Sequence, residues 1–140
     1  MYCTKRLQVY TRIRWLRNKI IIFTANKIDV KMDWKVLNDV AVLEEIISRS
    51  ASRPQVIFKH SIRCSISSVA KGRLDRSDSP SDVDFYYLDL VNNREISNKI
   101  AEIFMIDHES PQVLVIRNGE CVYDESHMGI NMQEILAVAV

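Results

Sequence analysis

The chain has 140 residues, 47% of them hydrophobic and 26% charged, which predicts one globular domain with a core of its own. Three scattered cysteines exclude a disulfide framework and favour a reducing, cytoplasmic compartment. No apolar run approaches the roughly 18 residues that cross a bilayer, so we expect no membrane span.

The net charge of +1 hides two unlike pieces of chain. Residues 1–31 hold eight Lys and Arg against one acidic residue, whereas residues 32–140 hold 11 against 17. The first piece has no clear helical or strand period, and its Arg-rich composition is that of a transit peptide or of a segment that binds an anionic surface. Since Met32 opens a stretch typical of a protein start, we predict a dispensable basic tail, 1–31, and one domain, 32–140. The acidic charge of that domain argues against nucleic acid as a partner.

The predicted elements of the domain begin with a helix over residues 33–50. Asp33 is the expected N-cap, apolar residues recur about every 3.6 positions, and Pro54 prevents continuation. The sequence then predicts a strand (55–60), a helix (64–74), a strand (83–91) and a helix (92–106). After these we expect a hairpin (111–125) that turns at Asn118-Gly119 and a last helix from residue 131 onward.

From residue 55 this order is that of a thioredoxin fold. A right-handed crossover makes the first two strands parallel, and the hairpin adds two antiparallel strands. The near-continuous apolar end of the second strand favours burial on both faces. We therefore predict an α/β, thioredoxin-like fold with a four-stranded mixed sheet flanked by helices and an extra N-terminal helix.

Cys64 lies between the end of the predicted strand 55–60 and the start of the helix that follows, in "VIFKHSIRCSIS". A sulfur at a helix N-terminus meets unpaired N–H groups and the positive end of the helix dipole, and neighbouring Arg63 adds a positive charge. All three stabilise a thiolate, the form that attacks disulfides. The alternative is that Cys64 is a small buried hydrophobe, which its polar, serine-rich flanks make less favourable.

The residue three positions after Cys64 decides which thiol chemistry is open. A dithiol enzyme has a second cysteine there, whereas this chain has Ser67, so Cys64 can form a mixed disulfide but no internal CxxC bond. Ser67 either donates its hydroxyl to the thiolate or is an idle helix serine. Cys121 follows the hairpin turn at the far end of the sheet, roughly 15 Å away, which predicts a packing role.

Pro111 stands directly before the third strand, where thioredoxin-like proteins have a cis proline that faces the nucleophile. The bend exposes the backbone of the preceding residue, here Ser110, so that a substrate segment can pair with it as a short strand. A trans proline that merely starts the strand is the alternative, and the fold favours cis.

Four stretches resemble the YtxJ-type monothiol bacilliredoxins, thioredoxin-fold proteins of the bacillithiol system: "IFKHSIRCSIS", "FYYLDLVNNREISNKIAE", "ESPQVLVIRNGE" and "ESHMGI". The match covers about residues 32–139, and the phrase around Cys64 is its most specific part. The resemblance implies that Cys64 removes bacillithiol from S-thiolated client proteins and that a second thiol, of a small molecule or a protein, regenerates it. The chain departs from the family at Ser65, where proline is usual and suits the first helical position.

The resemblance also implies candidates for holding the carboxylates of bacillithiol by charge, which are otherwise ordinary solvated strand-end residues: Lys59, His60 and Arg63. Three residues after the last strand, which returns to the active-site end of the sheet, could line the groove that holds bacillithiol: Ser126, His127 and Gly129. Two other functions remain as alternatives. One is a general monothiol reductase that uses another low-molecular-weight thiol, and the other is a non-catalytic thioredoxin-like adaptor that binds partners through the Ser110-Pro111 edge. The histidines show no metal-ligand spacing, so no metal site is expected.

Overall fold

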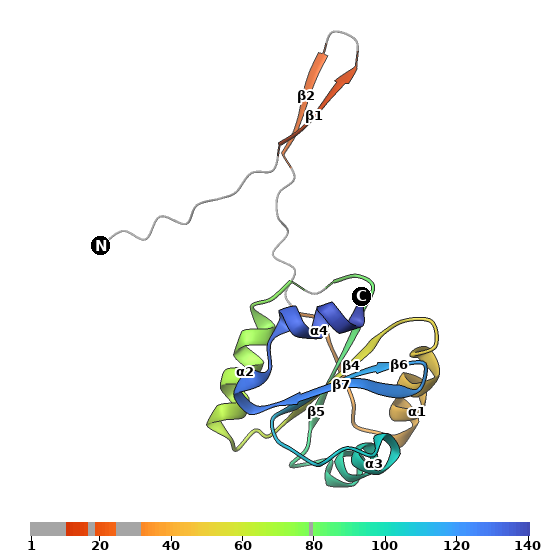
Figure 1. The fold of residues 1–140 in the computed structure, drawn as a ribbon. Helices are drawn as coiled ribbons and strands as arrows, with labels where there is room; N and C mark the ends of the chain where they lie inside the picture. Colours follow the sequence, from red (N-terminus) through yellow and green to blue (C-terminus); the bar gives the residue numbers. More distant parts are fainter. Residues whose placement is uncertain (1–10, 17–18, 25–31, 79) are drawn as a thin grey trace, which may run out of the picture.

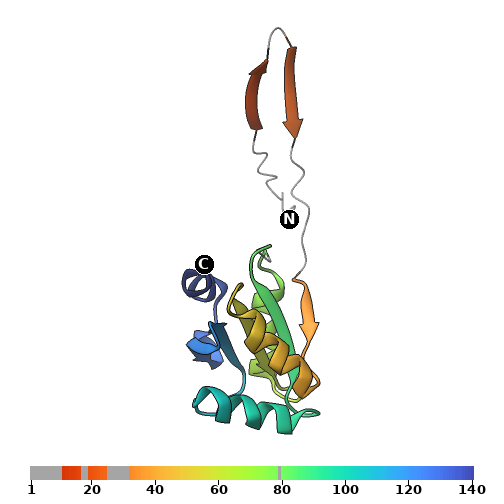
Figure 2. The ribbon, with the colours of Figure 1, turned by 90° about the vertical axis from the view of Figure 1, so that its right-hand side faces the viewer.

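The computed structural model describes residues 11–16, 19–24, 32–78 and 80–140. From residue 32 onward the chain forms a five-stranded mixed sheet with strand order β3-β5-β4-β6-β7, and Figure 2 shows β3 and β7 at opposite edges. β3, β5 and β4 are parallel, whereas β4 with β6 and β6 with β7 pair antiparallel. The strands are β3 (Trp34–Val36), β4 (Gln55–His60), β5 (Asp84–Asp89), β6 (Gln112–Arg117) and β7 (Glu120–Ser126). The helices are α1 (Val40–Arg49), α2 (Ser65–Asp75), α3 (Arg94–Phe104), the one-turn 3-10 helix η1 (His127–Gly129) and α4 (Met132–Ala139).

Helices cover both faces of this sheet (Figure 1). α1 and α3 bury one core, which includes Ile46, Ile57 and Ile100. α2 and α4 bury the other, which includes Phe58 and Ile135. β4 is the central strand, and all six of its side chains are buried. Its apolar residues are divided between the two cores, as expected for a strand covered on both faces.

Most predicted elements from residue 55 onward are confirmed to within two residues. β4 matches its predicted range, β4 and β5 are parallel, and β6 and β7 form the expected hairpin. The turn residues Asn118 and Gly119 both have positive φ (52° and 79°), as a tight hairpin turn requires. The thioredoxin-like order of elements therefore holds.

The predicted helix over residues 33–50 is wrong in its first part. Residues 34–36 form β3, and α1 begins only at Val40, with Asp39 rather than Asp33 as its N-cap. Val36, counted toward the apolar face of the helix, is exposed. Pairing with β5 and the ring contacts of Trp34 override a pattern that also suits a helix. The sheet consequently has five strands rather than four, and the extra N-terminal element is a strand followed by a helix.

Residues 1–31 are described only in part. β1 (Thr11–Leu16) and β2 (Lys19–Thr24) form a two-stranded antiparallel sheet, although the sequence showed no strand period there. The rest of this segment lies outside the described residues, and the boundary at residue 32 stays a prediction. Within the described ranges, no helix has the length and apolarity needed to cross a membrane.

Two glycines give a matched test of this fold. Gly119 has a φ of 79°, where a side chain is strained, whereas Gly72 lies inside α2 with no atom within 4 Å of the place a Cβ would take. We expect Gly119→Ala to lower the free energy of unfolding by about 1 kcal/mol and Gly72→Ala to raise it by about 0.5 kcal/mol. Urea unfolding of both variants measures this, and equal changes would contradict the turn conformation.

Candidate active site

The link between β4 and α2 places Cys64 at the start of a helix. α2 begins at Ser65, and Cys64 is its N-cap, with extended backbone angles (φ −112°, ψ 122°). The Cys64 N–H donates to the carbonyl of Ser61, and its carbonyl accepts the N–H of Ser68, each at 3.1 Å. The thiol is half-buried and makes no side-chain cap hydrogen bond. The first N–H groups of α2 lack intrahelical partners and stabilise negative charge here. The predicted placement of Cys64 at a helix N-terminus is confirmed.

Ser67 and His60 tie this link to the strand. Ser67 is fully buried, and its Oγ accepts the N–H of Ser61 (3.0 Å) and lies 2.6 Å from Nδ1 of His60. Burial, followed by the charge of Lys71, lowers the pKa of His60, which favours its neutral ring. Ser67 therefore joins the link to the end of β4, and the structure gives no hydrogen bond between its hydroxyl and Cys64.

The peptide bond between Ser110 and Pro111 is cis, as predicted. It directly precedes β6, whose Gln112 is the register partner of Lys59 in β4. The bend consequently lies at the same end of the sheet as the β4–α2 link. Within the described residues the Ser110 backbone makes no backbone hydrogen bond, and the Ser110 Oγ is buried without a partner. The unpaired backbone groups are what an added strand would need for pairing, whereas the buried Oγ does not face solvent.

η1 joins the cis-proline segment from the side of β7. The N–H of His127 donates to the carbonyl of Pro111 (3.0 Å), and its Nε2 lies 2.8 Å from Oε2 of Glu109. Arg73 of α2 donates to the carbonyl of Met128 (3.3 Å). The residues that follow β7 therefore lie beside the cis proline, and their lining of a bacillithiol groove stays a prediction.

Two of the three basic residues expected to hold a cofactor are buried. Lys59 is 0% exposed and His60 is 5% exposed, so neither reaches a ligand in solvent. The expectation is wrong for both, because the sheet stays covered up to the last residue of β4. Arg63 is exposed next to Cys64 and remains a candidate.

Lys59 instead belongs to a polar cluster that the sequence analysis missed, with Lys59 and Gln112 buried and His108 exposed at its edge. Its Nζ donates to Oε1 of Gln112 and to Nδ1 of His108, each at 3.0 Å. Burial lowers the pKa of Lys59 from 10.5 to about 8. Burial, followed by the charge of Lys59, also lowers the pKa of His108, which keeps that ring neutral and able to accept. The available signal was a lysine directly after the apolar run 56–58 of the strand "QVIFKH".

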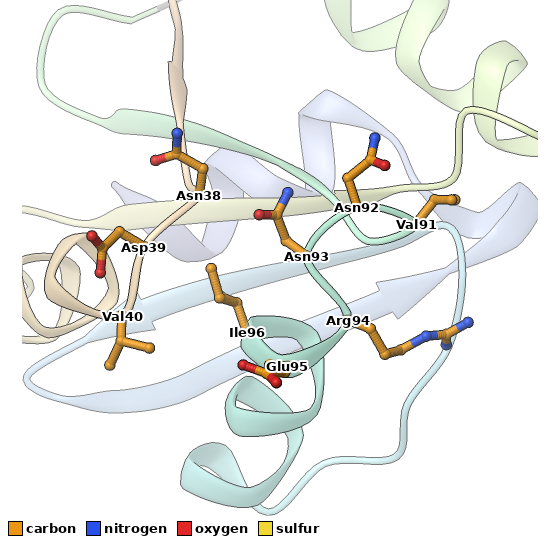
Figure 3. A pocket seen from close by; sticks show the side chains of 9 residues that line it. All are labelled: Asn38, Asp39, Val40, Val91, Asn92, Asn93, Arg94, Glu95 and Ile96. Atoms are coloured by element: carbon orange, nitrogen blue, oxygen red, sulfur yellow. The ribbon is translucent and has the colours of Figure 1, made fainter.

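A pocket of about 410 Å³ lies at the ends of β3 and β5 (Figure 3). It is formed by the connection from β3 to α1 and by the connection from β5 into α3. Its lining is mostly polar and consists of Asn38, Asp39, Val40, Val91, Asn92, Asn93, Arg94, Glu95 and Ile96. Neither Cys64 nor Ser110 lines it, so the thiol chemistry belongs elsewhere.

Cys121 is partly buried and has a packing role, as predicted. It lies near the start of β7 and contacts the core under α1 and α3, while the adjacent turn bonds to Ser50 at the end of α1. Burial raises the pKa of the Cys121 thiol to about 11, which leaves it protonated at neutral pH. Cys3 lies outside the described residues. In the part of the chain that the structure describes, no group of three His, Cys, Asp or Glu side chains could hold a metal ion.

Comparison with known proteins places this geometry in a family. The sequence profile of monothiol bacilliredoxin BrxC matches residues 35–135. The chain belongs to the monothiol bacilliredoxin family. This bacilliredoxin is also 33% identical to a solved protein described as an oxidoreductase with a thioredoxin fold, over 74% of this chain and 90% of that one, with a TM-score of 0.65.

Thioredoxins share the fold at lower identity. The thioredoxin of Malassezia sympodialis is 13% identical, with 83% of this chain and 99% of that chain covered and a TM-score of 0.67. The thioredoxin of Trypanosoma brucei brucei is 17% identical, with 75% and 88% covered and a TM-score of 0.62. These two likenesses concern the fold alone. Family membership and the 33% identical oxidoreductase support a thiol redox role, and the family implies a bacillithiol thiol system.

The buried Lys59 predicts a distinctive pH dependence of stability. Its pKa is 10.5 in the unfolded chain and about 8 in the fold, so between these values the unfolded chain binds more protons. The contribution of Lys59 to the free energy of unfolding therefore rises with pH through this window, by about 3 kcal/mol in total. We expect wild type to gain stability relative to Lys59→Met as the pH increases from about 8 to about 10. Urea unfolding at several pH values measures this difference, and a difference that does not change with pH would contradict it.

Proposed function

We propose that this bacilliredoxin is of the YtxJ type and removes bacillithiol, or a similar low-molecular-weight thiol, from protein mixed disulfides through Cys64. The observation that carries the proposal is a half-buried cysteine at a helix N-terminus, with a cis proline at the same end of the sheet. The cysteine supplies a nucleophile and the proline segment supplies a docking edge. Family membership supports this chemistry.

The proposed reaction is a pair of thiol–disulfide exchanges. The Cys64 thiolate attacks the bacillithiol sulfur of a client disulfide, the client cysteine leaves as a thiolate, and a new S–S bond joins Cys64 to bacillithiol. A second thiolate then attacks that bacillithiol sulfur and releases Cys64. Each step breaks one S–S bond and forms another, so the client is reduced and the second thiol is oxidised. The N–H groups that open α2 stabilise the charge on Cys64 when it attacks and when it leaves.

Three neighbours of Cys64 serve substrate binding in this proposal. An extended client segment pairs with the backbone of Ser110, next to Pro111, which makes no backbone hydrogen bond among the described residues. The exposed guanidinium of Arg63 attracts the carboxylates of bacillithiol. Ser67 contributes indirectly, because its bond to the Ser61 N–H holds the link that carries Cys64.

The partners that this chemistry requires are S-thiolated client proteins and a reducing thiol, and both fit a cytoplasmic site of action. The matching family profile begins at residue 35. We therefore infer that residues 32–140 form the catalytic unit and that residues 1–31 are dispensable for the reaction.

One client protein, prepared in bacillithiolated and glutathionylated forms, tests the proposed function. We expect wild type to release bacillithiol at least about tenfold faster than glutathione and Cys64→Ser to release neither, because no mixed disulfide can form without the nucleophile. Cys121→Ala is the matched control and should retain activity. Mass spectrometry should find bacillithiol attached to Cys64. Equal release of both thiols would favour a general monothiol reductase, whereas client binding without any release would favour an adaptor.

Ser67→Cys tests the monothiol assignment by adding the second cysteine of a dithiol enzyme. The change restores the dithiol spacing, so the new thiol can attack the disulfide between Cys64 and bacillithiol and close an internal bond. After reaction with a bacillithiolated client, we expect wild type to carry the adduct and Ser67→Cys to have lost it, with two hydrogens fewer than the reduced chain. Ser52→Cys, which adds an exposed thiol just beyond α1, is the control and should keep the adduct. An adduct that persists equally in Ser67→Cys would count against this geometry.

A further inference from the structure

The amine of Lys59 connects the strand that leads to the nucleophile with the segment that holds the cis proline. Its Nζ reaches from β4 to Oε1 of Gln112, the residue directly after Pro111. Its second bond, to Nδ1 of His108, goes to the segment between α3 and β6. Because an ammonium can only donate, both partners must accept.

The Gln112 side chain is in turn hydrogen-bonded to the segment that ends in Ser110. Its Oε1 also accepts the N–H of Glu109 (3.4 Å), and its Nε2 donates to the carbonyl of Asp107 (3.0 Å) and to Oδ2 of Asp124 in β7 (3.4 Å). A side-chain amide could in principle face either way. With the Lys59 ammonium on one side, only the oxygen can face it, so the NH₂ group must face Asp107.

The two acceptor atoms that Lys59 contacts would each keep a hydrogen bond without it. Without the amine, Nδ1 of His108 would keep the hydroxyl of Ser97 at 3.2 Å, and Oε1 of Gln112 would keep the Glu109 N–H. An apolar side chain of similar length would fill the same space without desolvating a charge. What the amine adds is a second and shorter bond to Oε1 of Gln112 (3.0 Å against 3.4 Å from the Glu109 N–H), which joins the Gln112 amide to β4 and holds it in this orientation more firmly.

We propose that Lys59 is a positioning residue that orients Gln112 and thereby fixes segment 107–111, so that the Ser110 backbone is held ready to pair with a client. This rests on the proposed function, because it concerns how a client docks. Lys59 lies on the face of the sheet covered by α1 and α3 and bonds to no part of the Cys64 link. Its role is therefore in client binding and not in the reactivity of the sulfur.

Steady-state kinetics of full-length Lys59→Met test this inference. A bacillithiolated client protein is the docking substrate, and the disulfide of bacillithiol itself is the small substrate that has no chain to pair with Ser110. We expect KM for the protein client to rise about tenfold, with its kcat and the rate on the small disulfide within about twofold of wild type.

Two further variants separate positioning from general damage. Lys35→Met removes an ammonium that bonds to Asp84 (2.9 Å) at the opposite end of the sheet, and it should leave KM unchanged. Gln112→Leu should raise KM about as much as Lys59→Met. The double variant should be no worse than either single one, because both changes break the same connection.

A KM for Lys59→Met within about twofold of wild type would overturn the inference, and so would an equal loss of rate on the small disulfide. If wild type does not reduce the client, the proposed function fails, and amide hydrogen exchange decides the inference separately. Lys59→Met should then speed exchange at Glu109, whose N–H donates to Oε1 of Gln112, by at least about fivefold, while Lys35→Met leaves it unchanged. Unchanged exchange in Lys59→Met would overturn it.

Discussion

The active end of this protein depends on one buried hydroxyl. Ser67 accepts the N–H of Ser61 and pairs with the ring of His60, which fixes the link between the end of β4 and the start of α2. Because Ser67 lies in the first turn of α2, a side chain of the helix itself fixes the link that leads into it. Cys64 stands inside that link, so a side chain within the helix determines where a sulfur just outside it lies.

Strand direction brings the second half of the site to the same place. β6 is antiparallel to β4, so the first residue of β6 lies beside the end of β4, and the register pairs Gln112 with Lys59. The cis Pro111 bond therefore falls near the link to Cys64, although the two are distant in sequence. Were β6 parallel to β4, the hairpin turn would lie at this end of the sheet in place of the cis proline.

The sequence was sufficient where local pattern determines structure. An apolar strand followed by a serine-rich helix placed Cys64, whereas the cis bond before β6 was predicted from the thioredoxin-like order of elements and not from the proline alone. It was not sufficient for β3, because the spacing of apolar residues there also suits a helix and the pairing with β5 is not visible locally. The burial of Lys59 was missed for a related reason. A polar residue near a strand end is solvated unless distant segments cover it, and here those segments contribute Ser97, His108 and Gln112.

Partial burial holds Cys121 protonated at the opposite end of the sheet from Cys64. Among the described residues, the protein thus carries no internal thiol able to take an adduct from Cys64. Under the proposed chemistry every turnover must end in a collision with a reductant from solution, so the loaded form persists for as long as that reductant is scarce. The fraction of molecules carrying an adduct would then follow the thiol balance of the cell, and the same chain would act as a gauge of oxidative stress as well as a repair catalyst.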